Sequence, residues 1–258
     1  MKNFARVRSA VVGAVLLGLS AVANAIPTLQ LGIGGGTYDS LTQTVIASSN
    51  SFSLYAYLIP DTTNPYTDIY TISMAVSDQV SVETDLGSFK VDGNVINVTS
   101  GMNYGIPPVD NMVDDLQKHS VFPTYFVEKT FSFDSSNQSG IFNAEDHPSF
   151  DPQSGTGMYY KEFKIDVTNF DEKYAIHFDL YKVSPVTEEH CTGHGKKKIC
   201  TTVPTGELEI SQFAPFSHDA QSGPGGDGGG PPNETPEPAP MFLLGLGLLG
   251  MAWMRRKT

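Results

Sequence analysis

The residues best suited to chemistry gather around one pair of cysteines. Cys191 and Cys200 are the only cysteines in the chain, and His190 and His194 lie beside them. In an exported protein such a pair is typical of a disulfide, so we predict a Cys191–Cys200 bridge that closes a Gly-rich, basic turn. The alternative is a zinc site of the two cysteines and two histidines. That site needs free thiolates, which an oxidising compartment removes.

Calcium is the other metal that the residue types suggest, because it binds several converging oxygen atoms. Acidic and amide side chains cluster at Asp110, Asn111, Asp114 and Asp115, at Asp61, Asn64 and Asp68, and at Asn143, Glu145, Asp146 and Asp151. None of these clusters has the spacing of an EF-hand or a calcium-binding repeat, and ordinary turns use the same residues. We therefore predict no metal or other cofactor, with bound calcium as the alternative and no favoured cluster.

Signs of catalysis are weak. The G-x-S-x-G elbow of serine hydrolases does not occur. A glycosidase needs two carboxylates roughly 5–10 Å apart, and 28 acidic residues make some such pair almost inevitable. His177 falls on the polar face of its predicted strand and is expected at the surface, while the spacing of the other histidines singles none of them out. We predict that the protein is not an enzyme and keep a secreted hydrolase as an alternative.

Tyrosines offer a second kind of site, because an exposed aromatic ring can stack on a sugar. The candidate pairs are Tyr55 and Tyr57, Tyr66 and Tyr70, and Tyr159 and Tyr160. Aromatic side chains are also the commonest large components of cores, so a second layer of structure covering them is the simpler expectation. A carbohydrate-binding module is thus an alternative function.

The charge distribution excludes one class of partner. The formal net charge is −12, while Lys2, Arg6 and Arg8 at one end and Arg255, Arg256 and Lys257 at the other contribute +6, so the segment between them carries −18. That segment contains no arginine. Since phosphate binding requires Lys and Arg, we expect no nucleic-acid partner.

The body of the chain, residues 26–222, reads as β-structure throughout. Apolar residues recur with period two between Gly, Pro, Asn and Asp, as in Phe52, Leu54, Ala56 and Leu58, which is typical of strands with one buried face. The expected strands are 29–33, 44–47, 52–59, 69–76, 95–98, 124–133, 163–167, 174–183 and 206–212. The pattern predicts eight to eleven strands in an antiparallel β-sandwich or jelly roll, with one short helix within 107–119.

The N-terminus has the three parts of a secretory signal. A basic segment precedes an apolar stretch, residues 10–23, and Ala23 and Ala25 form an A-x-A cleavage site. We predict that signal peptidase removes residues 1–25 and that the mature chain begins at Ile26.

The C-terminus has a different order of parts. A Gly/Pro-rich linker, residues 223–235, precedes Pro236-Glu237-Pro238, an apolar run at 239–254, and Arg255 and Arg256. As a helix, the 16 apolar residues would rise about 24 Å, less than a ~30 Å hydrocarbon core. We predict one short transmembrane helix whose basic end stays in the cytoplasm.

At these residues the chain resembles PEP-CTERM proteins, which share a Pro-Glu-Pro motif, one short transmembrane helix and a terminal basic cluster. The resemblance implies an exosortase, a membrane-embedded cysteine transpeptidase, as partner, with cleavage near Pro236–Pro238. It also implies a Gram-negative host that makes exopolysaccharide or biofilm. The expected route is an inner-membrane-anchored precursor that reaches the cell surface or the extracellular matrix, where exopolysaccharide is a further expected partner.

Three stretches of the body resemble the choice-of-anchor N family of bacterial surface proteins: Thr28–Ser40, Phe52–Leu58 and Gln212–Pro224. That family implies one extracellular β-domain on an interchangeable C-terminal anchor, and no catalytic activity. Together the two resemblances predict a non-enzymatic, exported surface or matrix protein.

Overall fold

A computed structural model describes residues 26–40, 42–77, 79–108, 123–147, 149–192, 198–215 and 218–223. The expected signal peptide, most of the expected helix within 107–119 and the C-terminal tail lie outside these residues. Every named element in the described part is a β-strand, so the all-β prediction is confirmed there. The described part also contains no helix that is long and apolar enough to cross a membrane.

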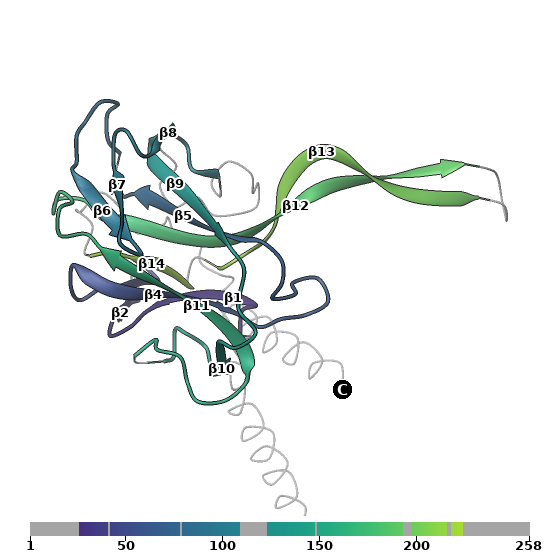
Figure 1. The fold of residues 1–258 in the computed structure, drawn as a ribbon, viewed down its shortest axis with the longest axis horizontal. Helices are drawn as coiled ribbons and strands as arrows, with labels where there is room; N and C mark the ends of the chain where they lie inside the picture. The colour runs from purple at the N-terminus through teal and green to yellow at the C-terminus, as the bar shows by residue number, and fades with distance from the viewer. Residues whose placement is uncertain are drawn as a thin grey trace, which may run out of the picture.

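The strands form two sheets that pack face to face as a sandwich (Figure 1). The first sheet has six strands. Its order is β1 (Leu29–Ile33), β4 (Ser51–Leu58), β11 (Gly157–Asp166), β6 (Ser88–Val91) and β7 (Asn94–Asn97), with β10 (Gln138–Gly140) paired to the start of β11. All its pairs are antiparallel.

The second sheet has eight strands. Its order is β2 (Thr37–Asp39), β3 (Thr44–Ile46), β14 (Asp219–Gln221), β12 (Ile176–Thr192), β5 (Tyr70–Val76), β9 (Thr124–Phe131) and β8 (Asn103–Gly105), with β13 (Ile199–Phe213) also paired to β12. The β3–β14 pair is parallel, and the other pairs are antiparallel.

The core lies between the sheets and follows the expected period of two. The expected inner face of β4 (Phe52, Leu54, Ala56 and Leu58) and that of β12 (Ile176, Phe178 and Leu180) are buried in one cluster. The Phe52 and Phe178 rings meet edge to face across the layers, with centroids 6.2 Å apart. Apolar alternation therefore specifies which face of each sheet is buried.

Two details of the sequence-based prediction are wrong. The described residues form fourteen strands rather than eight to eleven, because β2, β6, β8, β10 and β14 have only three or four residues and show no readable period. The second detail concerns the outer faces of the sheets, which were expected to be exposed to solvent but are partly covered. All seven residues of β5 are buried, so its outer face, which bears Thr71 and Ser73, is covered as well.

The six-stranded sheet is also partly covered on its outside. Tyr57 points outward from β4 yet is fully buried, because its ring packs on Phe142 with centroids 5.0 Å apart and its hydroxyl donates to the Phe150 carbonyl at 2.6 Å. The segment between β10 and β11, which we call the wall, thus covers part of this outer face.

Tyr57→Phe is expected to lower the free energy of unfolding at pH 7 by about 1–2 kcal/mol, since the buried Phe150 carbonyl loses its donor. Burial raises the pKa of Tyr57 above its ordinary value, so only the unfolded state ionises near pH 10. Between pH 9 and pH 11, the free energy of unfolding of the wild type should therefore fall by about 1 kcal/mol more than that of the variant. Urea unfolding at pH 7, 9 and 11 checks this, and curves that stay parallel would contradict it.

Candidate functional site

The most distinctive surface feature is a two-stranded ribbon that leaves the sandwich (Figure 1). β12 pairs with β5 only as far as Tyr181, and beyond that residue its partner is β13. We call residues 184–192 of β12 and 199–209 of β13 the arm. All its residues from Thr187 to Thr192 and from Cys200 to Glu209 are exposed, since no second layer covers the ribbon.

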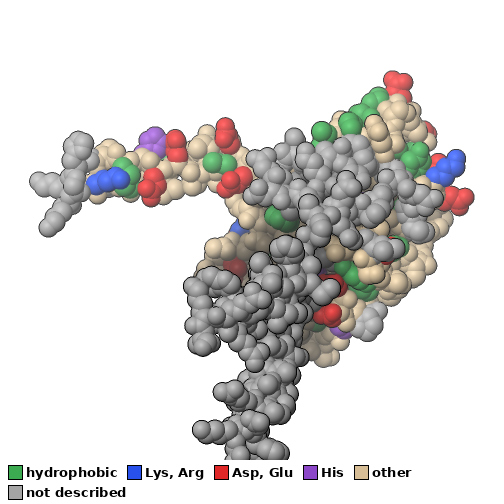
Figure 2. All heavy atoms as spheres, turned by 180° about the vertical axis from the view of Figure 1, so that it is seen from behind, with side chains coloured by type: hydrophobic (Ala, Val, Ile, Leu, Met, Phe, Trp, Pro, Cys, Tyr) green, Lys and Arg blue, Asp and Glu red, His purple; other side chains and the backbone are tan. Residues whose placement is uncertain are grey.

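The composition of the arm suits an exposed ribbon. An uncovered strand edge invites pairing with other chains, and prolines and charges prevent it. Pro185 and Pro204 lie within its strands. The register shifts between Pro185 and Thr187, and Thr187 is the cross-strand partner of Pro204. Acidic side chains lie on both strands: Glu188 and Glu189 on β12, and Glu207 and Glu209 on β13. Figure 2 shows acidic side chains along the projecting ribbon.

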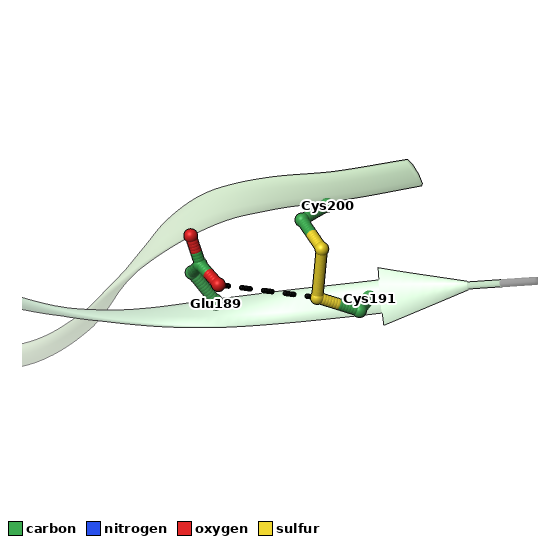
Figure 3. Close-up of side chains that lie close together, drawn as sticks. All are labelled: Glu189, Cys191 and Cys200. Atoms are coloured by element: carbon green, nitrogen blue, oxygen red, sulfur yellow. Dashed lines mark hydrogen bonds between the residues drawn. A yellow bond between two sulfur atoms is a disulfide. The ribbon is translucent and has the colours of Figure 1, made fainter. Parts of the chain in front are cut away.

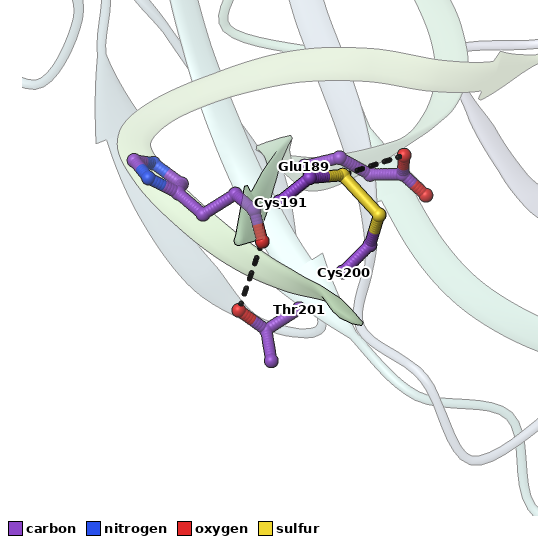
Figure 4. The surroundings of a disulfide bond; sticks show 5 residues. Glu189, Cys191, Cys200 and Thr201 are labelled. Carbon is purple, nitrogen blue, oxygen red and sulfur yellow. Dashed lines mark hydrogen bonds between the residues drawn. A yellow bond between two sulfur atoms is a disulfide. The ribbon is translucent and has the colours of Figure 1, made fainter. Parts of the chain in front are cut away.

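A disulfide closes the end of the arm. Cys191 and Cys200 are directly opposite in the ladder and their sulfur atoms are bonded, in keeping with the expectation from the sequence (Figure 3). The Glu189 carboxylate lies 4.0 Å from Cys191 Sγ, and Thr201 Oγ1 donates to the His190 carbonyl at 3.4 Å (Figure 4). Because the sulfurs are bonded to each other, the thiolates of the alternative zinc site are absent.

Replacing both Cys191 and Cys200 with Ser is expected to loosen the arm and leave the sandwich intact. A two-stranded ribbon without a core is marginally stable, and closing a ten-residue loop contributes about 2.5–3 kcal/mol. The equilibrium constant for local opening of the arm should therefore increase on the order of a hundredfold. The free energy of global unfolding should change by less than about 0.5 kcal/mol. Amide hydrogen exchange resolves the two regions. Equal deprotection of β12 inside and outside the sandwich would contradict this.

A second feature is an aromatic and polar patch on the outer face of the six-stranded sheet. We call Ser53, Tyr55, Tyr160, Glu162 and Lys164 the tyrosine face. The register places Tyr55 opposite Glu162 and Ser53 opposite Lys164. The Tyr55 and Tyr160 rings lie edge to face with centroids 6.1 Å apart, beside the wall that covers Tyr57.

Hydrogen bonds order the polar members of this face. The Tyr55 hydroxyl donates to Glu162 Oε1 at 3.3 Å, and Lys164 Nζ donates to Ser53 Oγ at 3.1 Å and to Glu162. Burial opposes ionisation of Glu162, but hydrogen bonds from Lys164, Ser53 and Tyr55 outweigh it and lower the pKa of that carboxyl. The face thus offers an ionised acceptor and a cationic donor next to two aromatic rings.

An open hollow of about 390 Å³ adjoins this face, and its lining includes Ser51, Ser53, Lys90, Gly93, Lys164 and Asp166. Lys90 Nζ donates to Asp166 at 2.9 Å. Asp166 is the one carboxylate in the lining, so the hollow itself does not supply the pair of acids that a glycosidase requires.

The other tyrosine pairs do not form shared surfaces. Tyr159 and Tyr160 point to opposite faces of β11, and Tyr159 stacks on Tyr66 with centroids 4.6 Å apart. Tyr70 is fully buried, and its hydroxyl donates to the Pro65 carbonyl at 3.0 Å. For Tyr57 and Tyr70 the expectation of a covering layer is confirmed.

The clusters considered for the alternative of bound calcium form hydrogen bonds within turns and ion pairs where the structure describes them. Asp61 Oδ1 accepts the backbone N–H groups of Thr63 and Asn64, both at 2.7 Å, and Asp68 pairs with Lys182 at 2.6 Å. The second cluster is similar: Asn143 Oδ1 accepts from Glu145 N at 3.1 Å and contacts His218 Nε2 at 2.6 Å.

The third cluster, Asp110 to Asp115, lies outside the described residues. Neither of the two groups of potential metal ligands found within the described ranges contains a carboxylate from the clusters at Asp61–Asp68 or Asn143–Asp151.

One cluster was not predicted from the sequence. His177 and Asp179 alternate on β12, and Asp219 lies beside them on β14. His177 Nε2 is 3.3 Å from Asp179 Oδ1 and 3.3 Å from Asp219 Oδ2. The side chains of Asp179 and Asp219 are 10% and 2% exposed, and that of His177 is 17% exposed.

The expectation that His177 is a surface residue is therefore wrong. Alternation correctly placed it on the outer face of β12, but it does not reveal whether that face is covered. Burial opposes the charged imidazole, yet the carboxylates of Asp219 and Asp179 outweigh it and raise the pKa of His177 well above its ordinary value. The only signal for this cluster in the sequence is that Asp179 follows the strand residue His177 by two positions, which puts both side chains on the same face of the strand.

The predicted processing sites lie outside the described residues: Ala23 and Ala25 at the N-terminus, and Pro236, Glu237, Pro238, Arg255 and Arg256 at the C-terminus. The evidence for the second set comes from comparison with known proteins.

None of the curated proteins compared with this chain matches it. Among solved structures, the chain is similar to the collagen-binding subdomain of the Enterococcus faecalis surface protein ACE, at 6% identity and a TM-score of 0.20, over 78% of this chain and 99% of that one. That name describes what the other protein binds, and a TM-score of this size supports no conclusion about this chain.

A family model described as the PEP-CTERM protein-sorting motif matches residues 234–257. The match includes every residue of the expected motif and of the basic cluster before Thr258. Such a motif implies an exported precursor that is anchored in the membrane of a Gram-negative bacterium. The C-terminal segment of this chain is thus a PEP-CTERM sorting signal, joined by a Gly/Pro-rich stretch to a β-sandwich.

Proposed function

We propose that the chain is a non-enzymatic surface or matrix protein, delivered by an exosortase that acts on its C-terminal tail. The observation that carries the proposal is the sorting motif at residues 234–257, attached to a self-contained sandwich. Signal peptidase acts first, at Ala25. The inner membrane holds the precursor through residues 239–254, and cleavage near Pro236–Pro238 then frees the sandwich for the cell surface or the matrix.

The body of the chain supports a structural role in three ways. The acidic, arginine-free surface keeps an exported domain soluble, and the disulfide fits an oxidising compartment. The projecting arm extends the domain away from the sandwich without a second hydrophobic core. Finally, the resemblance to the choice-of-anchor N family fits one extracellular β-domain on an anchor. Exopolysaccharide is the proposed surrounding material.

Changing Pro236, Glu237 and Pro238 together to Ala in the native host tests the sorting step. The variant precursor is expected to stay in the inner-membrane fraction at full length, while the wild-type domain reaches the surface or the medium. Asn233→Ala, just outside the matched segment, is the control and should behave like the wild type. Equal surface delivery of the triple variant and the wild type would contradict the proposal.

A second proposed function, carbohydrate binding, is favoured by the tyrosine face. Tyr55 and Tyr160 present rings next to an ionised Glu162, and the tyrosine face meets a hollow of about 390 Å³ at Ser53 and Lys164. This arrangement suits stacking and hydroxyl recognition on a glycan chain. A Tyr55→Ala, Tyr160→Ala double variant should lose binding to host exopolysaccharide. The control Tyr104→Ala removes a part-exposed ring on the other sheet. Unchanged binding by the double variant would exclude this face.

A further inference from the structure

The residues His177, Asp179 and Asp219 belong to neither the arm nor the tyrosine face. They sit on the outer face of the eight-stranded sheet, where β14 and β12 are neighbours. One ligand atom from each residue, the imidazole nitrogen and two carboxylate oxygens, lies within 4.8 Å of the other two. Burying two carboxylates together is costly unless a cation lies between them, and either the protonated imidazole of His177 or a bound metal ion can be that cation.

The spacing is that of ligands around one small ion. Zinc binds histidine nitrogen and carboxylate oxygen at about 2.0–2.2 Å in tetrahedral geometry, which separates neighbouring ligand atoms by about 3.3–3.5 Å. His177 Nε2 lies 3.3 Å from Asp179 Oδ1 and from Asp219 Oδ2. The two carboxylate oxygens lie within 4.8 Å of each other, so binding a common metal requires at most a small approach of one carboxylate to the other.

A fourth oxygen adjoins the cluster. Ser73 on β5 is the cross-strand partner of Asp179, so both side chains point to the outer face of the sheet. Ser73 is fully buried, and its Oγ has no hydrogen-bond partner within the part of the chain that the structure describes. A buried hydroxyl without a partner is unfavourable, and a metal ion or a water bound to one would satisfy it.

We propose that His177, Asp179 and Asp219 bind one divalent transition-metal ion of the Zn²⁺ or Mn²⁺ type, with Ser73 beside it. An imidazole among the ligands favours such an ion over Ca²⁺, which prefers six to eight oxygen atoms. The site joins β12 to β14, so bound metal would stabilise the pairing of these two strands. This inference is independent of the sorting proposal.

Metal binding by the purified mature protein, after treatment with EDTA and removal of the chelator, tests this site. Titration calorimetry with Zn²⁺, Mn²⁺ and Ca²⁺ is expected to show one equivalent of Zn²⁺ or Mn²⁺, weaker Ca²⁺ binding and a higher Tm in the metal-bound form. Asp179→Asn and Asp219→Asn should each lower the affinity at least tenfold. His190→Ala removes the exposed arm histidine that contacts Glu188 at 2.7 Å, and it should leave binding unchanged.

No uptake of Zn²⁺ or Mn²⁺ by the wild type would overturn the proposal, as would uptake that both Asp variants retain or that His190→Ala abolishes. If neither Asp variant folds, the visible spectrum of wild-type protein loaded with Co²⁺ decides. An intense band of a tetrahedral nitrogen-and-oxygen site is expected. The weak spectrum of hydrated Co²⁺ would contradict it.

Discussion

Phe178→Ala is expected to lower the free energy of unfolding by about 3–5 kcal/mol, a large share of the 5–15 kcal/mol typical of a domain. Phe178 is fully buried on β12, and its ring meets Phe52 of the opposite sheet at 6.2 Å. Removing the ring leaves a cavity between the layers at the strand that also begins the arm. Urea unfolding followed by far-ultraviolet circular dichroism measures the loss.

Leu208→Ala is the control for this prediction. Leu208 lies on the arm and is 60% exposed, so its loss should change stability by less than about 0.5 kcal/mol. Similar losses for the two variants would mean that the contact between the sheets does not dominate stability.

Gly87→Ala is expected to cost about 3 kcal/mol, although it adds a single methyl group. Gly87 has a φ of +82°, where side chains are strained, and an added Cβ would lie 2.2 Å from the Asn169 carbonyl oxygen. The same carbonyl accepts the N–H of Ser88 at 3.0 Å, and Gly87 forms a bridge with Phe170. The methyl group would therefore force this crossing of two segments apart.

Gly93→Ala separates the clash from the backbone strain. Gly93 has a φ of +80°, but an added Cβ would meet nothing within 4 Å. Only the strain of about 1 kcal/mol should remain. Thermal unfolding measures the difference in Tm between the two variants. Equal Tm values would show that Asn169 moves away from the added methyl group with little loss of stability.

The sandwich could be predicted from the sequence because its long strands have one face in a common core. In β1, β4 and the first part of β12, alternating apolar residues fixed both the element and its buried face. The short strands were missed for the opposite reason. β14, for example, has three residues, two of them Asp219 and Gln221, and it is held in place by tertiary pairing with β3 and β12.

The arm and the histidine cluster were missed for two different physical reasons. Beyond Val183, β12 has no core to face, so it loses the hydrophobic period by which strands are recognised, and its ladder continues only through β13. The cluster depends on Asp219 in a strand that was not predicted. Chain spacing places Asp179 near His177, but only the sheet order brings in a residue 40 positions further along.

Mass spectrometry of the mature protein from its native host tests the central claim most directly, since it reads both termini and the state of the cysteines together. We expect an N-terminus at Ile26, bridged Cys191 and Cys200, and a C-terminus cut near Pro236–Pro238 within the matched sorting segment. A surface-located chain with an intact C-terminus at Thr258 would contradict delivery by exosortase processing.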